Sequence, residues 1–482
     1  MRNVFVLPLV IILQAALFSQ TRQGAAPQTI AFTRVTVIDP ASAAVRRDLT
    51  VVITGNRISA LGKTGEVAMP KGAQVVDATG KFMIPGLWDM HAHFAYEARD
   101  VEKIYFPLQV INGVTGVRDM GSVGHPIERI KDWRARIAEG KLIGPRIGQT
   151  GMYLEHLEDD ESVTRASVRR IKRSGYDFVK VYSFISRVSF FAAVDEMKRQ
   201  GISFAGHVPA ALNVGEASEA GQRSIEHLQE MLASSSTKEA ELRKEAADWS
   251  KRIAELKGKP LTPALIEEGW RLLDKNIETY SEEKAAAFAA RFVKNNTWHC
   301  PTLVVNRQYA LREKPEIILG DPRASYIPLS HRHIWWLFAE AERAYPADWF
   351  AAERRRDELH LRMVKLLHRA GVGILAGADA TGYPFPGFSL HDELALFVQA
   401  GLTPLEALRT ATFNPAKYLG LLDSLGAIEP GKIADLALLD ADPLEEISNT
   451  KRIHAVVVNG RYLPKERLQK MLSEIEAEAE ER

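Results

Sequence analysis

The sequence predicts an α/β fold: a (β/α)8 TIM barrel accompanied by a small composite β-sandwich that both flanks of the chain build. Two observations in the middle of the chain indicate the barrel. Short apolar runs recur there, most of them separated by amphipathic helical sequence such as Pro126–Ala138 and Ser162–Arg173. Candidate metal ligands follow several of these runs, where barrel enzymes place their chemistry. The β-rich sequence at both ends of the chain indicates the sandwich.

Eight runs in the middle of the chain are typical of strands, because they are short, apolar and bounded by turn-like or helical sequence. Their alternation with helical segments is the pattern of parallel strands joined by crossover helices. The predicted strands lie near Met83–Phe94, Val114–Met120, Arg146–Tyr153, Phe178–Ser183, Phe204–Val208, Ser224–Leu228, Trp298–Val305 and Gly373–Ala380.

The strands of the two flanks are expected to form one small domain, from residues 25–80 and 420–465. Each flank alone offers too few strands to be independently stable, so we expect them to meet. The β-rich segments are Thr29–Asp39, Leu49–Ile53 and Ala73–Asp77 on the amino side, and Ala434–Leu439 and His454–Val458 on the carboxyl side.

Two long connections interrupt the predicted barrel, which we expect to occupy residues 81–419. The first, about 230–296, is charged and helical, and the second, about 306–371, is rich in tryptophan. Loops at the carboxyl ends of barrel strands shape access to the site, so a lid or a subunit contact is expected, with packing against the barrel as the alternative. Residues 466–482 are predicted to form an amphipathic C-terminal helix.

The first residues have the pattern of a secretory signal peptide, which we predict to cover residues 1–24. Arg2 precedes the apolar run Val4–Phe18, and small and polar residues follow. Export to the periplasm or out of the cell is therefore expected, with an uncleaved membrane anchor as the alternative. No second apolar stretch has the roughly 20 residues that a spanning helix needs, so no stable span is expected in the mature chain.

Composition limits the class of protein. The chain has 482 residues, of which 46% are hydrophobic and 26% charged, as in an ordinary globular enzyme rather than a disordered chain. A net charge of +1 favours no nucleic acid partner. The single cysteine, Cys300, excludes an internal disulfide, and its apolar surroundings argue against a thiolate nucleophile. A homo-oligomer stays open, because no interface can be predicted.

Histidine, lysine and aspartate side chains gather at the predicted strand ends. His91 and His93 are two residues apart on one strand, so their imidazoles point to the same side and can bind one cation. Each other candidate also lies at or near the carboxyl end of a predicted strand. The set favours a metal-dependent hydrolase. These further candidate ligands are Lys180, His207, His227 and Asp379.

Three other residues are candidates for substrate contacts. Tyr182 lies on the fourth predicted strand, His156 follows the third, and His391 opens a helix after the eighth. The alternatives are a wall position for the tyrosine and local hydrogen bonds for the two histidines. Arg118 and Asp119 are expected to pair with each other or to brace the second strand.

An ordered series of motifs runs along the chain: PGLWDMHAHF, GVTGVRDMG, FVKVYS, GHVPA, SIEHL, AGADA, ALRTATFNPAKYLG and GAIEPGKIADLALLDADPL. Together they resemble the amidohydrolase superfamily, in its imidazolonepropionase-like and Xaa-Pro dipeptidase (prolidase) branch. The HxH motif alone is weak, whereas the series is highly specific and runs from about Thr29 to Tyr462. The resemblance implies a distorted TIM barrel with a composite β-sandwich.

The resemblance also implies a metal centre with two divalent ions. In similar enzymes a lysine at the position of Lys180 reacts with carbon dioxide, and the resulting carbamate bridges the ions. Zinc is expected, because imidazole and carboxylate ligands suit it. By the same resemblance, one ion is held by His91, His93 and Asp379 and the other by His207 and His227.

The expected reaction is hydrolysis of an amide bond by a metal-bridging hydroxide, with Asp379 as proton acceptor and donor. The expected substrate is a small molecule: a peptide, an Xaa-Pro dipeptide or an N-acyl amino acid. Two alternatives stay open. A cyclic amide, lactone or organophosphate would suit the same site, and a noncatalytic exported binding protein is an alternative of another class.

Overall fold

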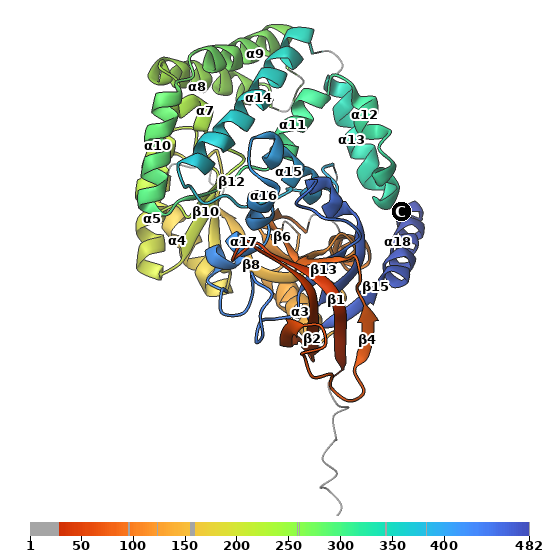
Figure 1. The fold of residues 1–482 in the computed structure, drawn as a ribbon. Coiled ribbons are helices and arrows are strands. Elements are labelled where there is room, and N and C mark those ends of the chain that lie inside the picture. Colours follow the sequence, from red (N-terminus) through yellow and green to blue (C-terminus); the bar gives the residue numbers. More distant parts are fainter. Residues whose placement is uncertain are drawn as a thin grey trace, which may run out of the picture.

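The computed structural model describes residues 28–94, 97–122, 124–154, 160–257, 259, 261–342, 345–381 and 383–481. The predicted signal peptide therefore lies outside the described residues. Within these ranges, no helix is both long and apolar enough to cross a membrane. Figure 1 shows a central body of strands and helices, with long strands at the bottom of the view and a group of helices at the top.

Seven parallel strands form the centre of the body. Their order in the sheet follows their order in the chain, so each strand pairs with the next one along the sequence. Every residue of β6 and β7 is buried, as expected for parallel strands that are covered on both faces. The strands are β6 (Leu87–Ala92), β7 (Val114–Asp119), β8 (Arg146–Leu154), β9 (Phe178–Val181), β10 (Ser203–Gly206), β11 (Ser224–Glu226) and β12 (Trp298–Cys300).

The predicted eighth strand, Gly373–Ala380, is not a regular strand, although its backbone bonds to both neighbours. The amide of Leu375 donates to a carbonyl of β12 at 2.8 Å, and the carbonyl of Ala376 accepts from an amide of β6 at 2.9 Å. A Cβ at Gly377 would lie 2.6 Å from Sγ of Cys300, so only glycine lets the segment pass this close. The seven strands and this segment make a nearly closed barrel.

Two predicted strands have other bounds in the structure. The prediction Met83–Phe94 divides into β5 (Phe82–Pro85), which belongs to the flanking sheet, and β6, which belongs to the barrel. The prediction Trp298–Val305 covers β12 and then the first turn of α11 (Leu303–Leu311). The strand cannot continue because Thr302 has a φ of 46°, a left-handed conformation that turns the chain into the helix.

Both flanks of the chain contribute to a single eight-stranded sheet, in the order β15-β14-β13-β5-β1-β2-β3, with β4 paired to β1. Its core mixes the two flanks, because Phe32 and Val51 pack with Leu436 and Val457. The sheet is thus composite in origin, and the two-layer sandwich stays a prediction. The strands are β1 (Thr29–Asp39), β2 (Ala44–Thr54), β3 (Arg57–Lys63), β4 (Gln74–Asp77), β5, β13 (Leu436–Leu439), β14 (Ile453–Val458) and β15 (Arg461–Pro464).

Helices connect the barrel strands, as expected for parallel strands with crossover connections. Helices α3 (Ile127–Ala138) and α4 (Glu161–Ser174) lie where the sequence predicts them. Helix α4 begins at Asp160, whose side chain accepts from the amide of Ser162, and ends at Gly175 in the left-handed conformation. The other helices between or after barrel strands include α5 (Arg187–Gln200), α6 (Val214–Ala220), α10 (Glu282–Asn295), α15 (Phe388–Gln399), α16 (Pro404–Thr410) and α17 (Phe413–Leu419).

The two long connections between strands are helical. In Figure 1, α8, α9 and α14 lie together at the top of the view, away from the flanking sheet. Helix α14 contacts both α9 and α11, so the second connection packs on the first. The first contains α7 (Met231–Ser234), α8 (Glu239–Glu255), α9 (Pro263–Glu278) and α10, and the second contains α11, α12 (Pro315–Leu319), η2 (Pro322–Tyr326), α13 (Leu329–Glu342) and α14 (Ala347–Arg369).

The last helix, α18 (Lys465–Glu480), packs on α2 (Phe106–Ile111). Its buried residues Leu468, Met471 and Ile475 recur at helical spacing, so one face of the helix joins the core. The remaining short helical elements are α1 (Ala98–Asp100), η1 (Val101–Tyr105) and η3 (Ile447–Lys451).

Candidate metal centre

Four predicted ligands, all histidines, bring their rings together at the carboxyl ends of the barrel strands. His91 lies in β6 and His93 directly after it, and their Nε2 atoms are 3.3 Å apart. His207 follows β10 and His227 follows β11. The ring centroids of His91 and His227 are 4.5 Å apart, and those of His207 and His227 are 5.0 Å apart. The parallel sheet therefore places the four imidazoles in one cluster.

The Nδ1 atom of each ring is held by a second residue. Such partners fix the tautomer and the orientation of metal-binding histidines, so that Nε2 is left for an ion. Nδ1 of His91 lies 2.8 Å from a carboxylate oxygen of Glu226, and Nδ1 of His93 lies 2.6 Å from the carbonyl oxygen of Gly121. Nδ1 of His207 lies 2.8 Å from the hydroxyl of Ser183, and Nδ1 of His227 lies 2.6 Å from the hydroxyl of Thr302.

Glu226 is itself fixed by a buried ion pair. Both of its oxygens accept from Nη2 of Arg118 at 3.0 Å, and neither side chain has exposed surface. Arg118 also donates to the carbonyl of Met90 at 2.6 Å. Arg118 thus pairs across the barrel rather than with Asp119, because adjacent residues of a strand point to opposite faces. Asp119 instead accepts from the hydroxyl of Ser122, in the loop after β7.

Lys180 lies among the histidines. It belongs to β9, is 2% exposed, and its Nζ is 3.4 Å from Nε2 of His91 and 3.4 Å from Nε2 of His93. Two aromatic rings face the same amine, since Nζ is 5.1 Å from the ring centroid of Tyr153 and 5.9 Å from that of Tyr182. Burial lowers the pKa of Lys180, because a charged ammonium is poorly solvated in this environment.

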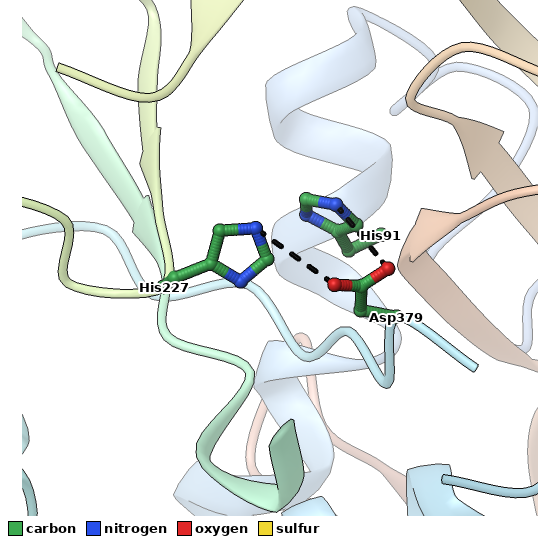
Figure 2. A group of neighbouring side chains, drawn as sticks. All are labelled: His91, His227 and Asp379. Atoms are coloured by element: carbon green, nitrogen blue, oxygen red, sulfur yellow. Dashed lines mark ion pairs between the residues drawn. The ribbon is translucent and has the colours of Figure 1, made fainter. Parts of the chain in front are cut away.

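Asp379 faces the histidines from the segment that closes the barrel, as Figure 2 shows for His91 and His227. Its Oδ1 lies 3.4 Å from Nε2 of His93 and 3.8 Å from Nε2 of His91, and its Oδ2 lies 3.9 Å from Nε2 of His227. The backbone of Asp379 has a φ of 48°, which costs energy for a residue other than glycine. Its amide donates to the carbonyl of His91 at 2.8 Å and holds this conformation. Such strain is concentrated at functional sites.

Burial sets the protonation of the cluster. It lowers the pKa of both His93 and His207 to about 3, and the positive charge of Lys180 acts in the same direction. It raises the pKa of Asp379 to about 7, against the lowering effect of Lys180. The imidazoles are therefore neutral, which is the form that binds metal ions, because a protonated ring nitrogen has no lone pair to offer.

The donor set fits divalent metal ions. His91, His227 and Asp379 offer ligand atoms that all lie within 4.8 Å of one another, which could hold an ion (Figure 2). Nε2 of His207 is buried and has no hydrogen-bond partner among the described residues. An unpaired polar atom is costly in a buried position unless a ligand meets it. Imidazole and carboxylate donors together suit zinc and related ions.

A cavity of about 590 Å³ adjoins the cluster, and Lys180 and Asp379 contribute to its lining. Tyr182 lines the cavity as well, with its ring stacked on that of His207 at a centroid separation of 4.4 Å. The tyrosine predicted to contact substrate therefore lies beside the cluster, where its ring supports a candidate ligand.

The two histidines predicted to contact substrate have different outcomes. His391 does not line the cavity among the described residues, because its ring nitrogens lie 3.0 Å from the hydroxyl of Thr450 and 3.0 Å from the carbonyl oxygen of Asn112. This histidine has a structural role between α15, η3 and the end of α2. It matches the alternative of local hydrogen bonds rather than the predicted substrate contact. His156 lies outside the described residues.

Sequence patterns gave no indication of several residues that line the cavity. Asn306 and Tyr309 of α11 and Arg356 of α14 belong to the second long connection. Tyr153, the last residue but one of β8, also lines the cavity, and its hydroxyl lies 3.1 Å from Nδ1 of His93. An aromatic residue at the end of a predicted barrel strand is a signal that could have identified Tyr153.

The fold and the cluster define a class of protein: an α/β barrel enzyme with a histidine-rich site at the carboxyl ends of its strands. The model of the amidohydrolase family matches residues 82–463. The chain belongs to this family.

Two relatives illustrate how far the sequence similarity extends. Imidazolonepropionase from Vibrio vulnificus (strain CMCP6) is 34% identical over 113 residues, which cover 22% of this chain and 27% of the relative. The match thus spans about a quarter of the length of that relative. Ochratoxinase from Aspergillus niger is 24% identical over 427 residues, which cover 83% of this chain and 79% of the relative.

Solved structures have the same fold. The bottromycin amidohydrolase structure has a TM-score of 0.68 and 23% identity, and the superposition covers 94% of this chain and 91% of that one. A Xaa-Pro dipeptidase with bound methionine in the active site has a TM-score of 0.59 and 19% identity, with 91% of this chain and 100% of that one covered. At these identities the likeness concerns the fold.

Proposed function

We propose that the protein is a binuclear metal-dependent hydrolase that cleaves the amide bond of a peptide, an Xaa-Pro dipeptide or an N-acyl amino acid. The observation that carries the proposal is the position of Lys180, with Nζ 3.4 Å from Nε2 of both His91 and His93. No ion pair holds its ammonium among the described residues. A buried lysine among metal-binding groups is explained if it serves as an anionic ligand.

Carboxylation would make Lys180 such a ligand. The neutral amine attacks carbon dioxide, an N–C bond forms and a proton is released, which leaves an anionic carbamate with two oxygen donors. Burial favours this step, because the lowered pKa of Lys180 increases the fraction of neutral amine. In the proposed set, His91, His93 and Asp379 would hold one ion, His207 and His227 would hold the other, and Lys180 would serve as a ligand of both.

Asp379 is the proposed proton carrier. When bound, the two ions polarise the scissile carbonyl and lower the pKa of a water molecule. Asp379 accepts the proton of the attacking water and passes it to the leaving amine. Its side chain lines the cavity, so its carboxyl can reach both the attacking water and the leaving amine of a substrate held there.

The names of similar proteins support an amide substrate. Bottromycin amidohydrolase and a Xaa-Pro dipeptidase share the fold over more than nine-tenths of this chain. Ochratoxinase matches 83% of the chain in sequence. We extend amide hydrolysis of this kind to the present protein as part of the proposal.

A substrate screen on metal-loaded protein tests the proposal. We expect about two zinc ions per chain by elemental analysis, and release of proline or phenylalanine from dipeptides or N-acyl amino acids. The variant Lys180→Ala should lose bound metal and turnover together, because the shared ligand is gone. Hydrolysis of lactones or phosphotriesters alone would favour the alternative substrates, and binding without turnover would favour a binding protein.

Export is a further part of the proposal. The apolar run Val4–Phe18 after Arg2 supports cleavage of residues 1–24 during secretion. Cell fractionation with N-terminal sequencing should find the mature chain outside the cytoplasm, beginning near residue 25. A cytoplasmic chain that retains its first residues would contradict this part.

A further inference from the structure

The second long connection places one positive charge in the cavity wall. Arg356 of α14 lines the cavity. Among the described residues that line it, Arg356 is the single charged side chain apart from Lys180, Asp379 and the histidines of the cluster. Its side chain is 23% exposed. A guanidinium cannot bind a metal ion, since it has donors and no acceptor, so Arg356 gives the wall a positive charge rather than a metal ligand.

Contacts with α14 and α11 hold Arg356 in position. Its Nη2 forms an ion pair with Glu353, which lies one turn earlier in α14 and is 4% exposed. Its Cζ lies 5.2 Å from the ring centroid of Tyr309, another residue of the cavity wall. The ion pair with Glu353 is formed through Nη2. Because a guanidinium carries five N–H donors, Arg356 has further donors to offer a ligand in the cavity.

Helix α11 links this wall to the metal centre. The side-chain amide of Asn306 donates to the carbonyl of His227 at 3.3 Å. The carboxylate of Glu393 accepts from the amides of the first two residues of α11 at 2.9 Å each. Both contacts anchor the first turn of the helix to the barrel. The position of Tyr309, further along α11, is therefore set relative to the metal ligands.

We propose that Arg356 binds the free carboxylate of the substrate, and so selects N-acyl amino acids and dipeptides over amides with a neutral end. This inference rests on the proposed amide hydrolysis. A guanidinium forms charge-assisted hydrogen bonds with carboxylate oxygens, and such pairs are short and strong. The ring of Tyr309 contacts the guanidinium through a cation–π interaction, which helps to hold it in the cavity wall.

The neighbours of Arg356 in the chain offer a matched control. Arg354, Arg355 and Arg356 are consecutive, and the helix turns each side chain in a different direction. Arg354 pairs with Glu313 and Arg355 with Asp274, and both arginine side chains are 47% exposed. Neither is among the described residues that line the cavity. Arg355→Gln therefore removes the same charge from the same helix without touching the proposed carboxylate site.

Kinetics with a matched substrate pair test the inference. N-acetyl-L-phenylalanine and its carboxamide contain the same scissile bond, which is assayed by release of acetate. We expect the wild type to prefer the acid by about 10- to 100-fold in kcat/KM. Arg356→Gln should abolish this preference by raising KM for the acid, Arg356→Lys should retain part of it, and Arg355→Gln should leave it unchanged. Equal losses for both substrates in Arg356→Gln would overturn the inference.

Calorimetric titration of the metal-loaded full chain with the same two compounds separates this inference from the proposed reaction. Tighter binding of the acid, weakened about 10- to 100-fold by Arg356→Gln, supports the carboxylate site even if neither compound is hydrolysed. Equal binding of the two compounds, including no binding of either, overturns it even if other amides are hydrolysed. Circular dichroism confirms that each variant is folded.

Discussion

The metal-ligand cluster and the cavity wall around Arg356 are built in different ways. The cluster takes one or two side chains from each of several barrel strands, so the hydrogen-bonded sheet fixes their spacing. The wall takes Asn306, Tyr309 and Arg356 from helices of one long connection, and their position depends on side-chain packing and a few anchors. The proposed chemistry therefore depends on the barrel, whereas the proposed substrate selection depends on helices that can vary separately.

The largest effect is expected from a change in the cluster itself. Asp379→Asn keeps the shape of the side chain and one oxygen but removes the proton acceptor. We expect kcat to fall about 10²- to 10⁴-fold when the variant is loaded to the same metal content as the wild type. Steady-state rates and elemental analysis of the purified variant measure the two quantities. A rate near that of the wild type would remove Asp379 from the proposed proton transfer.

A smaller effect is expected from a residue that supports the cluster. Ser183→Ala removes the partner of Nδ1 of His207, at 2.8 Å, and should weaken metal affinity about 10- to 100-fold in chelator competition. Ser186→Ala is the control, because Ser186 caps α5 by accepting from the amide of Ser189. The control should cost about 1 kcal/mol of stability and leave metal affinity unchanged. Equal metal affinities in the two variants would contradict a role for Ser183.

Glu393 holds the start of helix α11, which carries part of the cavity wall, so its ionisation tests how that helix is anchored. Burial raises its pKa from 4.5 to about 8, although the amides of Leu303 and Val304 act in the opposite direction. Because the folded pKa is the higher one, the stability contributed by the protonated carboxyl is fully present below about pH 4 and is lost as the pH rises through about 8. The protein should therefore become less stable over this interval.

The variant Glu393→Gln cannot ionise, and its amide group leaves one N–H of α11 unpaired. We expect it to lower the free energy of unfolding by about 1–3 kcal/mol at pH 6. The difference from the wild type should shrink at pH 9, where the buried carboxylate of the wild type is charged. Urea denaturation at the two pH values measures this. A difference that does not change with pH would argue against the raised pKa.

The smallest effect is expected on the outer surface of the helical connections. Arg271 of α9 pairs with Glu267 one turn earlier, and its side chain is 60% exposed. Arg271→Gln should change the free energy of unfolding by less than about 0.5 kcal/mol and leave activity and the preference for a carboxylate unchanged. A clear loss of activity would show that this surface also supports the site. It would contradict the division of roles between the barrel and the helical connections.

The ligand positions could be predicted because the alternation of side chains along a strand depends only on their spacing in the sequence. His91 and His93 are two residues apart, and a barrel puts the ends of its parallel strands at one edge. Glu226 carried a usable signal as well, since a carboxylate in an apolar strand needs a buried partner. The eighth strand was predicted from its apolar run, and the close passage of Gly377 past Cys300 could not be predicted from that run.

The cavity wall could not be predicted in the same way. The direction in which a helical residue points depends on how the whole helix packs, and the run Arg354–Arg356 gives no local signal of which arginine faces the cavity. His391 is the opposite case, because its position in the sequence gave a signal that the packing of its helix does not support. Its place after the last barrel segment suggests a substrate contact, but the packing of α15 turns its ring toward Thr450 and Asn112.

The pairing of β5 with β13 joins segments that are synthesised at very different times. β13 emerges from the ribosome about 350 residues after β5, which at about 5–20 residues per second is a delay of roughly 20–70 s. During that delay the edge of β5 lacks its native neighbour and offers open backbone groups to other nascent chains. Because one sheet is built from both flanks of the chain, we expect the polypeptide to need chaperones before β13 is synthesised.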